Sequence, residues 1–322
     1  MSHYLQTIEE VYTAAAVRPA AELCCTHSPV WRLPGLHVPE IMLQMNYGCG
    51  STVDPRDLKE DDTILYVGVG GGLEALQFAY FTRRPGSVIA IDPVHEMRQR
   101  AHENFANAAR LNSWFQPGFV TLLDGSALDL PMPNASVTVV AQNCLYNVFT
   151  SDDLQRSLAE VVRVLKPGGL FSTSDPVTPT PLPAALANDA VLRARCISGC
   201  QTFEGYLAAL TDAGFGRVEV RGRFPYRYLS PHEYAALETG VMLESVEVAV
   251  YKVPDGADGP AIFSGRAAVY TGEEATFDDG FGHLLQRGLP VSVSDAAAVR
   301  LARLPDIVVT GPTYHARDGG CC

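Results

Sequence analysis

Hydrophobic positions alternate between two spacings along the first two thirds of the chain. Short apolar runs of strand length are separated by longer segments whose apolar residues recur three and four positions apart. Because strands joined by crossover helices form a parallel sheet covered on both faces, we predict an α/β fold with a doubly wound, mostly parallel sheet. The predicted strands are TILYVGV, SVIAID, FVTLL, SVTVVAQ and GLFSTSD, and the predicted helices between them are GLEALQFAYF, HEMRQRAHENFANAARL and SDDLQRSLAEVVRVL.

Different patterns flank this region. Tyr4, Ile8 and Tyr12 recur at helical spacing and predict an N-terminal amphipathic helix. A segment rich in proline and glycine follows, from 29 to 55, and is expected to be irregular. Near the other end, half-buried strand patterns and a helix capped by Ser294 predict a smaller α+β unit. The expected parts are 1–60 (N-terminal helix and cysteine-bearing cap segment), 61–225 (α/β domain) and 226–322 (C-terminal α+β domain with a GGCC tail).

Charge and hydropathy narrow the possible partners. The chain has 24 Lys and Arg against 36 Asp and Glu, for a net charge of -12. No basic cluster is denser than Arg98-Gln99-Arg100, so we expect no binding to nucleic acid or to an anionic membrane. No apolar run reaches the length of a membrane span, and the N-terminal residues do not resemble a signal peptide. We therefore expect a cytoplasmic protein that acts on small molecules.

A glycine-rich turn follows the first predicted strand. Gly68, Gly70 and Gly72 in VGVGGG allow the backbone to approach a ligand closely at the carboxyl edge of the sheet. Asp92 ends the second strand, where a carboxylate can accept hydrogen bonds from ribose hydroxyls. These features predict a nucleoside-containing cofactor, and NAD-dependent enzymes share them.

Two later segments distinguish this chain from an NAD-dependent enzyme. DGSALDLP precedes the fourth strand and RVLKPGGLFSTSD follows a helix, and together with the glycine turn they resemble the class I S-adenosylmethionine-dependent methyltransferases, which have a Rossmann-like sheet. The resemblance implies that Asp124, Ser126 and Ala127 contact adenine and that Asn143 belongs to the cofactor site. These enzymes usually carry an acidic residue two positions before the first glycine, where this chain has Tyr66.

Eight cysteines are distributed unevenly. In a cytosolic chain of this size thiols are more often metal-binding or catalytic than disulfide-bonded. Adjacent cysteines rarely bridge each other, so each of the two vicinal pairs is expected to be a free dithiol. The cysteines are Cys24 with Cys25, Cys49, Cys144, Cys196 with Cys200 four positions later, and Cys321 with Cys322.

The order of four cysteine motifs around the predicted sheet resembles the arsenite S-adenosylmethionine methyltransferases. The motifs are CCT (24–26), YGCGS (47–51), QNCLYN (142–147) and RCISG (195–199). The resemblance implies that Cys49, Cys144 and Cys196 hold trivalent arsenic as thiolates, and that Cys24 exchanges with Cys49, with Cys25 as the alternative partner. The tail ending in DGGCC resembles the subgroup associated with arsenosugar biosynthesis.

The expected chemistry agrees with this resemblance. Thiolates are good ligands for a soft centre such as trivalent arsenic, and its lone pair can attack a sulfonium methyl without a general base. Reduction of the resulting pentavalent arsenic takes two electrons, which a dithiol can supply by closing a disulfide. We therefore expect S-adenosylmethionine as methyl donor, arsenite or methylarsenite thiol adducts as substrates, and an external thiol reductant such as glutathione or thioredoxin.

Other interpretations remain open at this point. A methyltransferase of a small organic acceptor would need the same fold and leave the cysteines incidental, because a buried cysteine such as Cys144 is often a small packed hydrophobe. A non-catalytic thiol-dependent binder of a metalloid or metal is the third possibility, although the short ligand spacings of zinc sites are absent. Cys200 is expected to fill the core, and the terminal GGCC is either a metalloid-capture arm or an inconsequential tail.

Overall fold

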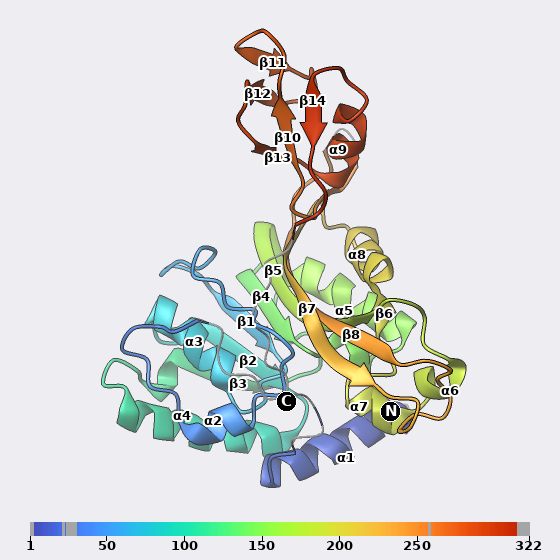
Figure 1. The fold of residues 1–322 in the computed structure, drawn as a ribbon. Coiled ribbons are helices and arrows are strands. Elements are labelled where there is room, and N and C mark those ends of the chain that lie inside the picture. Colours follow the sequence, from blue (N-terminus) through green and yellow to red (C-terminus); the bar gives the residue numbers. More distant parts are fainter. Residues whose placement is uncertain (1–2, 21–22, 24–30, 257–258, 314–322) are drawn as a thin grey trace.

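The computed structural model describes residues 3–20, 23, 31–256 and 259–313 as one large α/β body with a smaller unit above it (Figure 1). The helices are α1 (His3–Val17), α2 (Glu40–Gln44), α3 (Leu73–Thr82), α4 (His95–Leu111), α5 (Ser151–Val164), α6 (Ala184–Ala187), α7 (Ala190–Ala194), α8 (Phe203–Asp212) and α9 (Asp295–Leu301), with 3-10 turns η1 (Pro117–Phe119) and η2 (Tyr146–Val148). The strands are β1 (Ile64–Val67), β2 (Val88–Asp92), β3 (Val120–Asp124), β4 (Val137–Asn143), β5 (Leu165–Thr178), β6 (Gln201–Thr202), β7 (Arg217–Leu229), β8 (Val241–Tyr251), β9 (Ala261–Phe263), β10 (Ala267–Tyr270), β11 (Thr276–Asp278), β12 (Leu284–Gln286), β13 (Val291–Ser292) and β14 (Ile307–Val309).

The predicted doubly wound sheet is confirmed. Its strand order is β3-β2-β1-β4-β5-β8-β7-β9, and the pairs from β3 through β5 are all parallel. β8 joins antiparallel to β5 and to β7. The order reverses between β1 and β4, and in an open α/β sheet ligands bind outside the carboxyl ends of the strands at such a switch point. The glycine turn follows β1 and Cys144 follows β4, so both predicted motifs lie at this point.

Local sequence accounts for the helices that cover the sheet. Thr150 caps α5 by accepting a hydrogen bond from the Asp153 backbone, and Asp152 and Asp153 in its first turn complement the helix dipole. Gly214 adopts the left-handed conformation (φ 98°) just after α8, which lets the chain leave that helix as its position predicted.

The N-terminal segment covers the carboxyl end of the sheet. α1 confirms the predicted amphipathic helix, and its Tyr12 hydroxyl donates to the Ala194 carbonyl oxygen of α7 at 3.3 Å. Tyr4 donates to the carboxylate of Asp153 on α5. The segment expected to be irregular contains one short helix, α2. α1 is thus attached to two other helices near the switch point.

The C-terminal boundary differs from the expectation that a second unit begins at residue 226. β7 continues to Leu229, and β8 lies between β5 and β7 in the large sheet. The alternating pattern of β8 fitted a half-buried strand, but pattern alone does not specify which sheet a strand joins. The smaller unit instead comprises β10 to β14 and α9, which form a second hydrophobic core separate from the main one.

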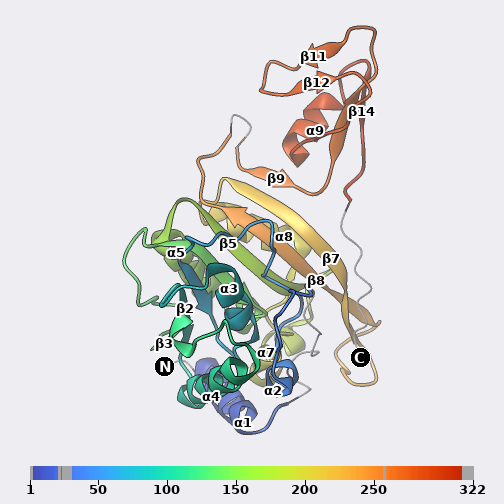
Figure 2. The ribbon, with the colours of Figure 1, turned by 90° about the vertical axis from the view of Figure 1, so that its left-hand side faces the viewer.

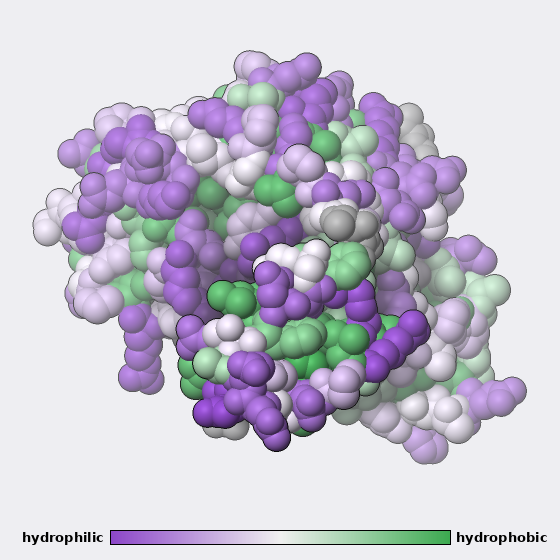
Figure 3. Space-filling view, turned by 90° about the horizontal axis from the view of Figure 1, so that it is seen from above, coloured by the Kyte–Doolittle hydropathy of each residue, from purple (hydrophilic) through white to green (hydrophobic). Residues whose placement is uncertain are grey.

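This smaller unit stands clear of the large sheet in both side views (Figures 1 and 2). Looking down on the molecule, Figure 3 shows hydrophobic residues exposed among hydrophilic ones. Large apolar side chains exposed in this unit are Phe281, Leu284, Leu289, Val299 and Val308.

Across the described ranges, every helix is too short or too polar to cross a lipid bilayer.

Candidate functional site

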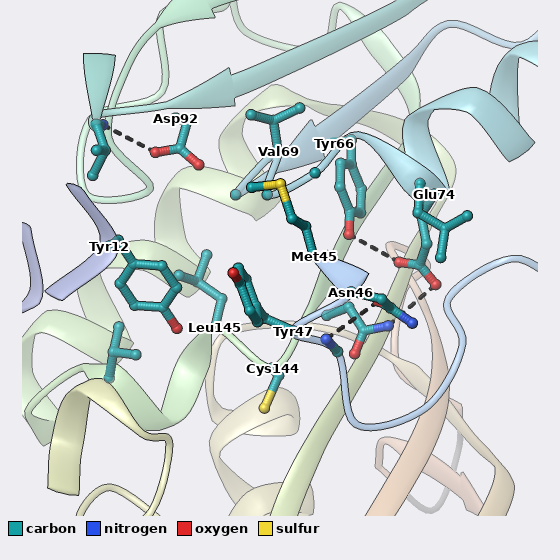
Figure 4. Close-up of a pocket in the computed structure, with 18 of the residues that line it drawn as sticks. Tyr12, Met45, Asn46, Tyr47, Tyr66, Val69, Glu74, Asp92, Cys144 and Leu145 are labelled. Carbon is teal, nitrogen blue, oxygen red and sulfur yellow. Dashed lines mark hydrogen bonds between the residues drawn. The ribbon is translucent and has the colours of Figure 1, made fainter. Parts of the chain in front are cut away.

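A cavity opens at the switch point of the sheet. Its wall includes the glycine turn after β1, Asp92 at the end of β2, and Cys144 after β4 (Figure 4). Tyr12 of α1 and Tyr47 from the cap segment close it from the opposite side. Cavities in this position hold cofactors or small ligands in α/β enzymes.

The first two glycines of the turn leave room for a ligand, whereas the third has a packing role. Gly68 (φ 83°) and Gly70 (φ 51°) are left-handed, and a Cβ at either position would have no neighbour closer than 3.9 Å. Gly72 is the N-cap of α3 and does not line the cavity, and a Cβ there would lie 2.8 Å from the ring of Phe105. The glycine requirement at Gly72 therefore comes from packing against Phe105 together with its left-handed backbone (φ 87°).

Asp92 presents a buried carboxylate at the cavity wall. Its Oδ1 accepts a hydrogen bond from the Val94 backbone at 2.9 Å. Burial raises the pKa of Asp92 to about 6, although hydrogen bonds from the Val94 and Gly70 backbones and the charge of Arg98 oppose that rise. A carboxylate in this position fits the hydroxyls of a ribose, as predicted from the sequence.

An adjoining apolar cavity carries two of the three predicted adenine contacts. Ser126 and Ala127 line it, together with Leu5 and Ile8 of α1. Asp124 lines neither cavity; its side chain is 76% exposed and pairs with Arg98 at 2.9 Å. The structure therefore separates Asp124 from Ser126 and Ala127, because the side chain of Asp124 turns outward at the end of β3.

Among the cysteines that the structure describes, Cys144 is the one that lines the main cavity. It is 4% exposed, follows β4 directly, and its side chain hydrogen-bonds the thiol of Cys49. Cys196 Sγ donates to the backbone carbonyl oxygen of Cys144 at 2.8 Å. Cys49 and Cys196 are both 0% exposed. Three segments that are far apart in the sequence thus meet at Cys144.

Backbone conformation shapes this meeting point. Cys144 (φ 59°) and Cys196 (φ 57°) both adopt the left-handed region, which L-residues seldom enter. Such conformations persist only where the surrounding structure fixes them, and they cluster at functional sites. The RCISG segment requires glycine at Gly199, because a Cβ there would lie 2.2 Å from the Asn147 carbonyl oxygen. The loops that carry Cys144 and Cys196 are therefore packed backbone to backbone.

The thiols are close but do not form a preassembled ion site. Among the residues that the structure describes, no three His, Cys, Asp or Glu side chains are arranged to hold a metal ion. Burial raises the pKa of the Cys49 thiol, and the nearby charge of Asp175 adds to that rise. Joint binding of one atom by all three sulfurs would require the Cys196 side chain to turn away from the Cys144 carbonyl. Cys24, Cys25, Cys321 and Cys322 lie outside the described residues.

Cys200 is held within the Cys196 loop. Its thiol donates to the Cys196 carbonyl oxygen at 3.2 Å and accepts from Asn147 Nδ2 at 3.2 Å. It is buried and does not line the main cavity. This environment agrees with the packing role expected for it.

Sequence reasoning missed Glu74 of α3, a buried acid at the cavity wall. Its carboxylate accepts a hydrogen bond from Tyr66 at 3.0 Å and from Asn143 Nδ2 at 3.1 Å (Figure 4). Burial raises the pKa of Glu74, whereas the surrounding donors lower it. An acid two residues after the glycine turn was the available indication, but it was also the pattern of an ordinary helix N-terminus.

Asp175 was also missed. This carboxylate lies within β5 and is 0% exposed. It accepts hydrogen bonds from the Tyr206 hydroxyl at 2.8 Å and from the Tyr146 backbone N–H at 3.0 Å. It also accepts from the amide of Gln142. Burial raises the pKa of Asp175 to about 7 despite these donors. Its charge faces the region of the thiols.

Comparison with known proteins relates part of the chain to methyltransferases. The model of methyltransferase domains matches residues 65–173. An arsenite methyltransferase of Halobacterium salinarum is 31% identical over 176 residues, or 55% of this chain and 43% of the relative. That of Aquipseudomonas alcaligenes is 31% identical over 184 residues, or 55% of this chain and 51% of the relative. The methyltransferase region of the chain is thus similar to arsenite methyltransferases.

The fold agrees with a solved structure of such an enzyme. An arsenic(III) S-adenosylmethionine methyltransferase from Chlamydomonas reinhardtii superimposes with a TM-score of 0.60 at 22% identity, covering 85% of this chain and 93% of the other. The chain spans about half the length of the curated relatives that it matches in sequence. These relatives therefore bear on the methyltransferase region more than on the whole protein.

Proposed function

We propose that this protein transfers a methyl group from S-adenosylmethionine to trivalent arsenic held by thiols. The observation that carries the proposal is the position of Cys144, which lines the cavity of the glycine turn and also contacts both Cys49 and Cys196. The curated relatives named arsenite methyltransferase support the same activity. An organic acceptor would leave this convergence of thiols unexplained.

The cavity residues fit the methyl donor. Gly68 and Gly70 leave open space at the turn, Asp92 offers a buried carboxylate for ribose, and Ser126 and Ala127 line an apolar cavity suited to adenine. When bound, S-adenosylmethionine supplies a sulfonium-activated methyl group that the arsenic lone pair attacks, leaving S-adenosylhomocysteine and pentavalent arsenic. The role of the chain is to orient the two reactants, an effect worth up to about 7 to 11 kcal/mol in well-oriented cases.

The thiols would act as ligands and then as reductants. Each cysteine that binds arsenite loses its proton to an arsenite oxygen, which leaves as water. The raised pKa of Cys49 keeps that thiol protonated until arsenic arrives, so the proton is available for this exchange. Return of arsenic to the trivalent state would take two electrons from a thiol pair, with Cys49 and either Cys24 or Cys25 closing a disulfide. Glutathione or thioredoxin would reopen it.

The test is chromatography of arsenic species after incubation with arsenite, glutathione and S-adenosylmethionine. We expect methylated arsenic only when all three are present, and at least a hundredfold less product from Cys144→Ser, since near-attack geometry depends on that ligand. Cys200→Ser is the matched control and should retain most of the product, because Cys200 lies away from the cavity. Arsenite-independent methylation of an organic acceptor would contradict the proposal.

Assignment to the arsenosugar subgroup remains a prediction.

A further inference from the structure

Glu74 lies where three parts of the chain meet. Its carboxylate accepts two hydrogen bonds from Thr52, from the backbone N–H at 2.9 Å and from the hydroxyl at 2.7 Å. Tyr66 of β1 and Asn143 of β4 donate the other two, at 3.0 and 3.1 Å. A carboxylate has about four lone-pair positions, so these four donors use its capacity. Glu74 therefore has no acceptor position left for a bound cofactor.

Asn143 extends this network to Cys49. Its Oδ1 accepts from the Cys49 backbone N–H at 3.0 Å, and its Nδ2 donates to the Gly50 carbonyl oxygen at 2.9 Å as well as to Glu74. The contact is tight, because a Cβ on Gly48 would lie 2.5 Å from the Asn143 side chain. The residues between α2 and β1 lack regular secondary structure, so side-chain hydrogen bonds must satisfy this backbone.

We propose that Glu74 is a positioning residue that fixes Cys49, through Asn143 and Thr52, to the helix that begins at the cofactor's glycine turn. The inference deepens the proposed function and rests on it. Tyr66 then has a defined role, because its hydroxyl donates to this acid of the following helix. Because the hydrogen bonds of Glu74 connect the Cys49 loop to the helix after the glycine turn, the distance between this thiol ligand and the bound methyl donor would stay constant.

Thiol alkylation tests the inference without arsenic or methyl donor. Cys49 is 0% exposed, so iodoacetamide reaches it only when its loop opens, and peptide mass spectrometry can follow each cysteine separately. Glu74→Gln removes the negative charge and one of the two acceptor oxygens, which weakens the hydrogen bonds from Thr52 and Asn143, and we expect alkylation of Cys49 to accelerate about tenfold or more relative to Cys200. Glu96→Gln, the same change in the first turn of α4, should leave this ratio unchanged.

A double variant separates positioning from general loss of structure. In Glu74→Gln with Asn143→Asp, the new amide can donate to the new carboxylate, which still accepts from the Cys49 N–H. We expect Cys49 in the double variant to be alkylated more slowly than the summed effects of the two single changes predict. Such non-additivity indicates a direct contact between the two residues. Additive effects, or a Cys49-to-Cys200 ratio that stays at the parent value in Glu74→Gln, would overturn the inference.

Two further outcomes are distinguishable. If Glu74→Gln does not fold, Thr52→Val takes its place, since it removes one donor and keeps the carboxylate. A rise in the alkylation of Cys49 relative to Cys200 would support the inference. No rise would overturn it. If the parent protein develops no arsenic–thiolate ultraviolet absorption with arsenite, the proposed function fails. The alkylation ratios would still decide whether Glu74 positions Cys49.

Discussion

Single residues at the switch point combine burial with charge. Asp92, Glu74 and Asp175 are all less than a tenth exposed, and burial raises the pKa of each carboxyl. Hydrogen-bond donors compensate in each case, as they must for charged groups in a protein interior. Perturbed carboxyl groups gathered around one cavity are typical of functional sites. Here Asp92 and Glu74 line the cavity, and Asp175 lies close enough to Cys49 to raise the pKa of that thiol.

Asp175 should make folding stability depend on pH. Its pKa is raised from an ordinary value near 3.8 to about 7, so between these values the folded protein keeps a proton that the unfolded chain has released. The native state then binds more protons, and the free energy of unfolding should fall by up to about 1.4 kcal/mol for each pH unit from about 4 to 7.

Urea unfolding of the parent and of Asp175→Asn across this range provides the measurement. The variant should lose the part of the slope that Asp175 contributes, most clearly between about pH 6 and 7, because an amide does not titrate. The two proteins share Asp92, whose raised pKa contributes a similar slope below about 6. Equal slopes in the parent and the variant would show that Asp175 titrates as it does in the unfolded chain.

At the scale of elements, α1 connects the cavity to the cysteine loops. Tyr12 lines the cavity, donates to the Ala194 carbonyl two residues before Cys196, and packs edge-on against Tyr47, with ring centroids 6.2 Å apart. Tyr47 in turn lies two residues before Cys49. The helix thus touches both loops whose thiols meet at Cys144.

Removal of the Tyr12 ring should weaken cofactor binding. Loss of a half-buried aromatic wall costs about 1.5 kcal/mol or more, so Tyr12→Ala should raise the dissociation constant for S-adenosylhomocysteine about tenfold. Tyr12→Phe keeps the ring and loses only a 3.3 Å hydrogen bond, and should bind within about threefold of the parent. Isothermal titration calorimetry measures both. Equal losses in the two variants would mean that the hydroxyl, and not the ring, supports the cavity.

At the scale of the whole molecule, two separate cores predict two unfolding transitions. Leu285 lies at the centre of the smaller core and Leu65 in the main one, and each is 0% exposed. A Leu→Ala change in a core costs about 2 to 5 kcal/mol. In differential scanning calorimetry, Leu285→Ala should lower one transition and Leu65→Ala the other. A single transition that moves in both variants would indicate one cooperative unit.

The sequence by itself determined the main elements and predicted the cofactor half of the site. Periodicity predicted α1 and the strands from β1 to β5, because the spacing of apolar residues reflects which face of an element is buried. The glycine turn and Asp92 were identifiable because local backbone geometry and chain order place them at one edge of the sheet. The cysteine motifs indicated the resemblance to arsenite methyltransferases, and relatives of that name are similar to part of the chain.

Tertiary structure alone decided the contacts between remote segments. It assigned β8 to the large sheet, turned Asp124 away from the cavity, and brought Glu74 to Asn143 beside Cys49. None of these follows from local pattern, because strand pairing and side-chain direction depend on partners far away in the chain. For the same reason, the positions of the cysteines in the sequence did not show that they lie together. Only the packed fold brings the Cys49 and Cys196 loops to Cys144.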